Sequence, residues 1–185
     1  MLDLVMQDAE DRMEKAVQSL RRDLGTVRAG RATPAMLDKV MVEYYGSQMP
    51  INQVAGVSSP EPRMLVISPW DKSMLSEIEK AIQKSDLGLN PTNDGAVIRL
   101  VVPVLTEQRR QELAKQVRKM SEDSRVAVRN IRRDANDDLK KAEKAGDASE
   151  DDVHRLQEKV QGLTDRFIAE IDHMSAAKEQ DLKEV

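Results

Sequence analysis

Apolar residues recur every three or four positions in three long stretches of the chain. This spacing places their side chains on one face of a helix. The first stretch lies at the N-terminus and contains Met6, Ala9, Met13, Ala16, Leu20, Leu24 and Val27. We expect this helix to end near the segment AGRATP, where Gly30 can adopt a positive φ and Pro34 disfavours helical geometry in the residue before it.

The other two stretches lie in the C-terminal half. One begins at Leu113, after a candidate N-cap at Thr106, and its helix is expected to stop before Gly146. The last begins at Val153, behind Ser149, which has an acidic residue at capping-box spacing. Three helices that are each apolar on one side can close around a shared core, so residues 1–30 and 105–185 are predicted to form a long antiparallel three-helix bundle.

Residues 31–104 follow a different pattern. Three segments rich in β-branched residues are separated by Gly, Pro and Asn, which predicts strands, and a helical pattern ending at Gly88 lies between the second and third. The strand segments are KVMVEYY, RMLVIS and AVIRLVV. We therefore expect one short helix on a small sheet, inserted between the first two bundle helices. The fold class is α+β, with two adjacent linkers, GRATP and VPVLT, that can act as a hinge.

Two neighbouring tyrosines fall in the first predicted strand. Adjacent strand residues face opposite sides of a sheet, so one of Tyr44 and Tyr45 is expected in the core and the other on the surface or against a partner. The pattern leaves open which is which.

Arginines gather in the second bundle helix of a chain whose net charge is -4. On a helical wheel three of them lie within about 40° of a fourth, Arg118, and away from the apolar stripe. These four are Arg118, Arg125, Arg129 and Arg132, which we call the arginine row. Most acids of this helix project elsewhere, with Glu122 as the exception.

The charge asymmetry extends along the bundle. Residues 109–133 contain nine basic and three acidic residues, whereas residues 147–185 contain five basic and eleven acidic ones. Because the planar guanidinium of arginine matches phosphate oxygens, the row is a candidate phosphate-binding surface. The alternative is that it is only the solvated face of a long helix.

Several classes of protein are disfavoured. The chain has no cysteine and its two histidines lie far apart, so we expect no metal site. It contains no glycine-rich phosphate loop and no nucleophile elbow, which predicts a protein that is not an enzyme and uses no cofactor. Its longest uncharged apolar run is much shorter than the roughly 20 residues of a membrane helix. We expect a cytoplasmic monomer with no membrane contact.

Five motifs in order resemble the bacterial ribosome recycling factor family, over nearly the whole chain. They are GRATP, VEYYG, SDLGLNP, LTEQRR and VAVRNIRRDAND. The resemblance implies an L-shaped protein that binds the ribosome after peptide release and separates the subunits together with elongation factor G and GTP. It also implies that the inserted domain moves on the hinge and is pushed by that factor.

The resemblance implies site residues as well. The family surface that contacts large-subunit ribosomal RNA corresponds to Arg110, Arg129 and Arg132, with Arg28 and Arg133 as neighbours. Together with Arg118 and Arg125 from the helical wheel, these form the predicted RNA-binding set. The predicted hinge comprises Gly30, Arg31, Pro34, Pro103 and Val104. Val104 stands where many members have a second proline, a difference that could loosen the hinge.

Two other functions are compatible with the pattern. A helical scaffold or chaperone-like module would use its exposed helix faces to hold protein partners and would depend little on RNA. An enzyme is the most distant alternative, because the motifs that carry catalysis are missing.

Overall fold

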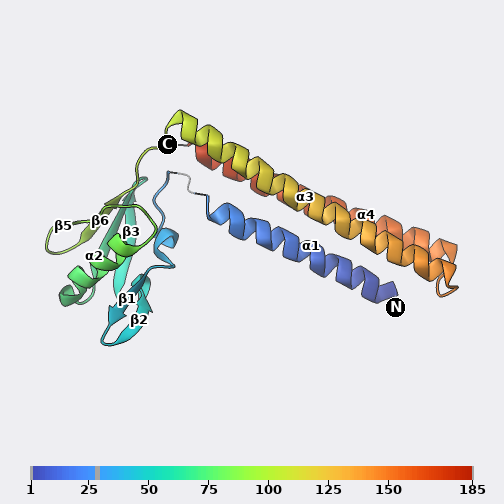
Figure 1. The fold of residues 1–185 in the computed structure, drawn as a ribbon, viewed down its shortest axis with the longest axis horizontal. Coiled ribbons are helices and arrows are strands. Elements are labelled where there is room, and N and C mark those ends of the chain that lie inside the picture. The colour runs from blue at the N-terminus through green and yellow to red at the C-terminus, as the bar shows by residue number, and fades with distance from the viewer. Residues whose placement is uncertain (1, 28–29, 185) are drawn as a thin grey trace. The chain divides into compact units, whose positions relative to one another are not determined.

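The computed structural model describes residues 2–27 and 30–184, which divide into two compact units (Figure 1). One unit contains the three long helices α1 (Leu2–Gly25), α3 (Glu107–Lys144) and α4 (Glu150–Lys183). The other spans Gly30–Thr106 and contains the strands and a short helix. The α+β fold class is confirmed.

The apolar stripes of the three long helices form the core of the bundle. Figure 1 shows α3 and α4 side by side along their length, and α1 contacts both of them. Fully buried side chains come from every helix: Met13, Val17, Leu20, Val117, Val128, Leu139, Val160, Phe167 and Ile171. Full burial of one such side chain stabilises a fold by roughly 1.5–3 kcal/mol, so the shared core, rather than helix propensity, holds the bundle together.

The turn between α3 and α4 has the predicted end signals. Gly146 follows α3 with φ 77°, and its N–H bonds the carbonyl three residues back at 3.1 Å. The N–H of Asp147 bonds the carbonyl oxygen of Ala142 at 2.9 Å, which completes a Schellman motif. The Ser149 hydroxyl accepts from the backbone N–H of Asp152 at 3.1 Å and caps α4. Both predicted signals are confirmed.

Helix α1 ends earlier than the AGRATP segment suggested. Its last residue is Gly25, and the next residue, Thr26, bonds back to the carbonyl oxygen of Asp23 through its hydroxyl at 2.6 Å and its N–H at 3.1 Å. This bonding closes the last turn, so the helix stops here although the apolar spacing continues to Val27.

The inserted unit contains two antiparallel sheets rather than the single sheet expected. A hairpin pairs β1 (Met41–Tyr44) with β2 (Ser47–Pro50). The second sheet has the order β3-β4-β6-β5. Its strands are β3 (Ala55–Glu61), β4 (Met64–Pro69), β5 (Thr92–Asn93) and β6 (Ile98–Val101). The pattern missed β2, β3 and β5 because they are short or rich in polar residues, Gly and Pro.

A separate core lies inside this unit. Leu65 pairs with Leu100 and Ile67 with Ile98 across β4 and β6, and all four side chains are fully buried. Helix α2 (Leu75–Lys84) contacts β1, and its residues Ile78 and Ile82 join the same core. The predicted short helix is confirmed. Because each unit buries its own apolar surface, each is a candidate for independent folding.

Candidate nucleic-acid interface

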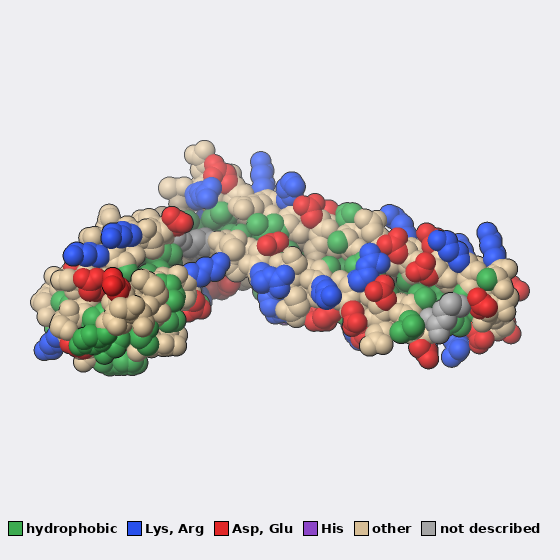
Figure 2. Space-filling view, turned by 60° about the horizontal axis from the view of Figure 1, so that its bottom comes forward, with side chains coloured by type: hydrophobic (Ala, Val, Ile, Leu, Met, Phe, Trp, Pro, Cys, Tyr) green, Lys and Arg blue, Asp and Glu red, His purple; other side chains and the backbone are tan. Residues whose placement is uncertain are grey.

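Helix α3 carries six of the seven arginines predicted to bind RNA: Arg110, Arg118, Arg125, Arg129, Arg132 and Arg133. The seventh, Arg28, lies outside the described residues. On the face of the bundle displayed in Figure 2, basic and acidic side chains are interspersed. The environment of each arginine therefore decides which of them can bind a further anion.

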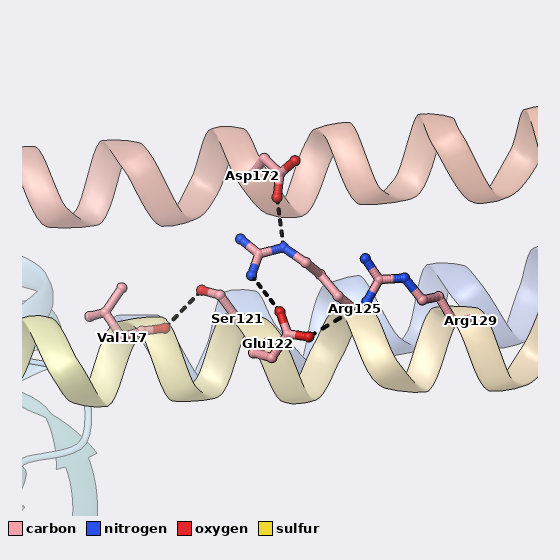
Figure 3. Close-up of polar contacts among 6 residues, drawn as sticks. All are labelled: Val117, Ser121, Glu122, Arg125, Arg129 and Asp172. Carbon is pink, nitrogen blue, oxygen red and sulfur yellow. Dashed lines mark hydrogen bonds and ion pairs between the residues drawn. The ribbon is translucent and has the colours of Figure 1, made fainter.

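Arg125 is a cross-link within the bundle and not a freely exposed side chain. Its Nε donates to Oδ1 of Asp172 on α4 at 2.7 Å, and its Nη1 donates to Oε2 of Glu122 at 3.1 Å (Figure 3). Only 22% of the side chain is exposed. Partial burial is the largest influence on its pKa and lowers it, but the hydrogen bonds to Asp172 and Glu122 outweigh burial and raise the pKa above its ordinary value. Arg125 therefore bonds Glu122, the one acid expected near the row, and also Asp172 of α4, which the helical wheel of α3 does not include.

Other members of the row also have acidic partners. Glu122 reaches a second guanidinium, with its Oε1 3.5 Å from Nη1 of Arg129. Near the start of α3, Nε of Arg118 lies 2.9 Å from Oε1 of Glu179. Two of the three carboxylates, Glu179 and Asp172, belong to α4, so a helical wheel drawn for α3 alone could not include them.

The end of the row has the most available positive charge. Arg132 is half-buried and has no hydrogen-bond or ion-pair partner within residues 2–27 and 30–184. The neighbouring Arg133 is exposed and bonds only the neutral side chain of Asn130, at 2.9 Å. Anions can therefore reach these two guanidinium groups without displacing a carboxylate.

Arg110 occupies a separate hollow where the start of α3 meets the end of α4. The hollow has a volume of about 430 Å³ and is also lined by Arg118, Glu179 and Lys183. Nε of Arg110 is buried and has no hydrogen-bond partner in the described part of the chain, and the nearest carboxylate, Glu107, lies 3.9 Å from its Nη1. Because this Nε is enclosed, an outside anion can contact Arg110 only through the 21% of its side chain that is exposed.

Both linkers bond to the same turn of the inserted unit. The N–H of Ala32 donates to the carbonyl oxygen of Pro62 at 2.7 Å, and the N–H of Val102 donates to that of Arg63 at 2.8 Å. Beyond these bonds, Gly30 has φ 72°, and a Cβ there would lie 3.3 Å from the Leu105 side chain. A larger residue at Gly30 would be strained for both reasons.

The remaining predicted hinge residues are exposed and lie close to these bonds. Arg31 precedes Ala32, and Pro34 begins the short 3₁₀ helix Pro34–Leu37. Pro103 and Val104 follow Val102 in a segment without regular secondary structure. Proline has no N–H to donate, so few backbone bonds restrain this segment.

The described residues contain no group of three or more His, Cys, Asp or Glu side chains that could hold a metal ion. Among the same residues, no helix is long and apolar enough to cross a membrane. The chemistry that the bundle does offer is a set of guanidinium groups along α3, which suits phosphate binding.

The family model described as ribosome recycling factor matches residues 20–182. The chain belongs to the ribosome recycling factor family. It is also 61% identical, over 185 residues and the full length of both chains, to the ribosome-recycling factor of Desulfitobacterium hafniense (strain Y51). The resemblance based on five motifs is thus confirmed.

Solved structures of recycling factors agree with this assignment. A solution structure of the ribosome recycling factor is 41% identical, with a TM-score of 0.82 over 100% of this chain and 98% of that one. Models for the T. thermophilus ribosome recycling factor and the E. coli elongation factor G bound to the E. coli post-termination complex include a chain that is 45% identical. That chain matches with a TM-score of 0.66 over 98% of both chains.

Proposed function

We propose that this protein binds the post-termination ribosome and, together with elongation factor G and GTP, separates it into subunits. The proposal rests on the family match, which spans both units. One of the similar chains is described on the post-termination complex together with elongation factor G. No comparable observation favours the helical scaffold or an enzyme.

We assign ribosome binding to the bundle. Arg132 and Arg133 are the primary phosphate ligands, because no carboxylate of the described residues competes for them. Arg129 is a secondary ligand, since its contact to Glu122 is long, and Arg110 contributes the exposed part of its side chain. Arg28 is included in the interface on the family resemblance alone. Arg118 and Arg125 act mainly through the positive potential of the row, because Nε of each already bonds a carboxylate.

We assign the movement to the inserted unit, with the two linkers as its hinge. Elongation factor G would push this unit while phosphate contacts hold the bundle on large-subunit ribosomal RNA. GTP hydrolysis then belongs to elongation factor G, and this chain acts as a monomer in the cytoplasm without catalysis of its own. The linker bonds to one turn and the separate cores of the two units support this division of roles.

Subunit splitting tests the proposal directly. Post-termination ribosomes mixed with this protein, elongation factor G and GTP should lose light scattering as the subunits separate. Scattering should stay constant when either factor or GTP is omitted. If the complete mixture leaves the ribosomes intact, recycling is the wrong function.

Ribosome binding by Arg132→Ala, measured over a range of salt concentrations, tests the binding surface. Loss of one phosphate contact should weaken ribosome binding and reduce the slope of log affinity against log salt by about one. Thermal stability should hardly change, because Arg132 has no partner among the described residues. Arg155→Ala on α4, which pairs only with Asp152 at 3.4 Å, removes the same charge away from the row and serves as the control. Equal effects of the two variants would contradict a specific role for Arg132.

A further inference from the structure

Tyr45 occupies a backbone position that a tyrosine rarely adopts. It is the first of the two turn residues between β1 and β2 and has φ 47°, and it is followed by Gly46 with φ 82°. Two positive φ values define the tight hairpin turn in which Asn, Asp or Gly is the usual first residue. Tyr45 is the one residue other than glycine with positive φ in the described part of the chain. Smaller residues form this turn with less strain, so turn formation does not explain why a tyrosine occupies position 45.

The side chain of Tyr45 is not buried in the inserted unit. It is 81% exposed, whereas Tyr44 is half-buried against the core, which answers which tyrosine faces outward. The two rings meet edge to face with centroids 4.5 Å apart, so Tyr44 helps to orient its neighbour. Folding therefore gains little from the Tyr45 ring, but a partner could bury it.

The only tryptophan of the chain lies near this tyrosine. Trp70 is 70% exposed and directly precedes Asp71. Hydrogen bonds from the hydroxyl and N–H of Ser73 lower the pKa of the Asp71 carboxyl, and the nearby Tyr45 hydroxyl lowers it slightly further. Asp71 thus follows Trp70 in the chain and lies near the Tyr45 hydroxyl. We call Tyr45, Trp70 and Asp71 the aromatic patch, and Figure 2 shows hydrophobic side chains gathered on part of this unit.

The aromatic patch lies at the end of β4 away from the linkers. Both linkers bond to the turn at Pro62 and Arg63, just before β4 begins, whereas Trp70 directly follows the last residue of β4. Six strand residues span roughly 20 Å. Within this unit, a force applied at the patch has a long lever arm about the linkers.

The composition of the patch indicates the class of its partner. Residues 30–106 contain seven basic and eight acidic residues, so this unit lacks the positive charge that RNA binding requires. The ionised Asp71 carboxylate would repel phosphates. Exposed Tyr and Trp side chains near one another are instead the residues that dominate binding energy in protein–protein interfaces.

We propose that the aromatic patch is the surface on which elongation factor G presses the inserted unit. This rests on the proposed function and assigns the contact to particular residues. The proposed partners are large-subunit ribosomal RNA, GTP and elongation factor G, and only the last of these is a protein. A push by elongation factor G is also most effective at the end of the unit far from the linkers.

Tyr45→Asn and Trp70→Ser test the patch. Asn fits the positive φ of the turn, so Tyr45→Asn should unfold at the same temperature as the wild type or above it. Ribosome pelleting should be unchanged, because the arginines of the bundle are untouched. The concentration of elongation factor G needed for half-maximal splitting should rise about tenfold or more in each variant.

Val101→Thr is the matched control. Val101 is 56% exposed in the same unit, and it pairs with Met64 at the linker end of β4. It should split ribosomes like the wild type. If Tyr45→Asn and Trp70→Ser also behave like the wild type, or if Val101→Thr is equally impaired, the patch is not the contact surface.

Two further results separate this inference from the proposed function. Weaker ribosome pelleting of the patch variants would assign the patch to the ribosome and overturn its assignment to elongation factor G. Failure of the wild type to split ribosomes would instead remove the proposed function. Because Trp70 is the only tryptophan, 5-fluorotryptophan labelling gives one ¹⁹F signal, and this signal should shift when elongation factor G is added to the ribosome-bound protein. An unshifted signal would contradict direct contact.

Discussion

Arginine side chains on one helix face serve different purposes according to their neighbours. Arg125 and Arg132 are two turns apart on α3, yet the first donates to two carboxylates and the second to none among residues 2–27 and 30–184. Glu122 forms ion pairs with both Arg125 and Arg129. This acid reduces the positive potential of the row and competes with phosphate for Arg129.

Glu122→Gln should therefore strengthen RNA binding. Removing the charge frees Arg129 from an ion pair and raises the local potential, so ribosome affinity at low salt should rise roughly two- to fivefold. Glu122 itself is exposed, and Arg125 keeps its bond to Asp172, so stability should change little. Filter binding of ribosomes over a range of salt concentrations measures the effect.

Glu77→Gln on α2 provides the control for this prediction. Glu77 is exposed in the inserted unit, so the substitution changes the net charge by the same amount away from the row. It should leave affinity nearly unaltered. An equal gain in both variants would mean that net charge alone matters, and no gain in Glu122→Gln would mean that Glu122 does not restrict the row.

At the scale of elements, α4 contains a glycine that helix propensity disfavours. Gly162 lies inside this 34-residue helix, where glycine costs roughly 1 kcal/mol relative to alanine. A Cβ at this position would meet nothing within 4 Å. Gly162 lines an open groove with Met6 of α1 and Leu163 of α4. The space left by its missing side chain therefore lies on the surface, and close packing of the helices does not require a glycine here.

Gly162→Ala should stabilise the protein by about 0.5–1 kcal/mol, because alanine restricts the unfolded chain and adds no clash. The unfolding midpoint of the bundle, followed by circular dichroism at 222 nm, should rise by about 2–8 °C. Gly146→Ala is the opposing control. Its φ of 77° disfavours any side chain, and it should lower the midpoint. A lower midpoint for Gly162→Ala would show that the space at Gly162 is needed.

At the scale of the whole molecule, two units with separate cores are joined by two chain crossings. The two linkers lie close together where they enter the inserted unit, since a Cβ on Gly30 would lie 3.3 Å from the Leu105 side chain. A short linker can therefore replace the inserted unit without stretching the chain. Anchoring and movement, as proposed, reside in different units and should be separable.

Deletion of residues 31–104, with a short linker from Gly30 to Leu105, should leave a folded bundle because its three apolar stripes need only one another. The variant should keep its helical circular dichroism and bind ribosomes. It should not split them, and it should compete with the wild type, because elongation factor G has nothing to push. Loss of helicity would contradict independent folding, and splitting by the deletion variant would contradict the role of the inserted unit.

The sequence alone was sufficient for those features that depend on neighbours within a few residues. The spacing of apolar positions predicts all three long helices, and Ser149 and Gly146 mark their ends, because caps are local hydrogen bonds. The strands with continuous β-branched residues were predicted for the same reason. The family was recognised from short motifs, and the match of its model to residues 20–182 established it.

The tertiary structure decided which charged groups are available. Asp172 and Glu179 lie about 50 residues or more after their arginine partners, and they reach them only because α4 packs antiparallel to α3 in one particular register. Likewise, β2 and β5 are formed by pairing with a neighbouring strand and not by their own composition. Periodicity reports which face of a helix is polar, but the register of packing determines which of those polar groups meet. For this reason the sequence could predict a row of arginines, and only the fold could separate the structural Arg125 from the available Arg132.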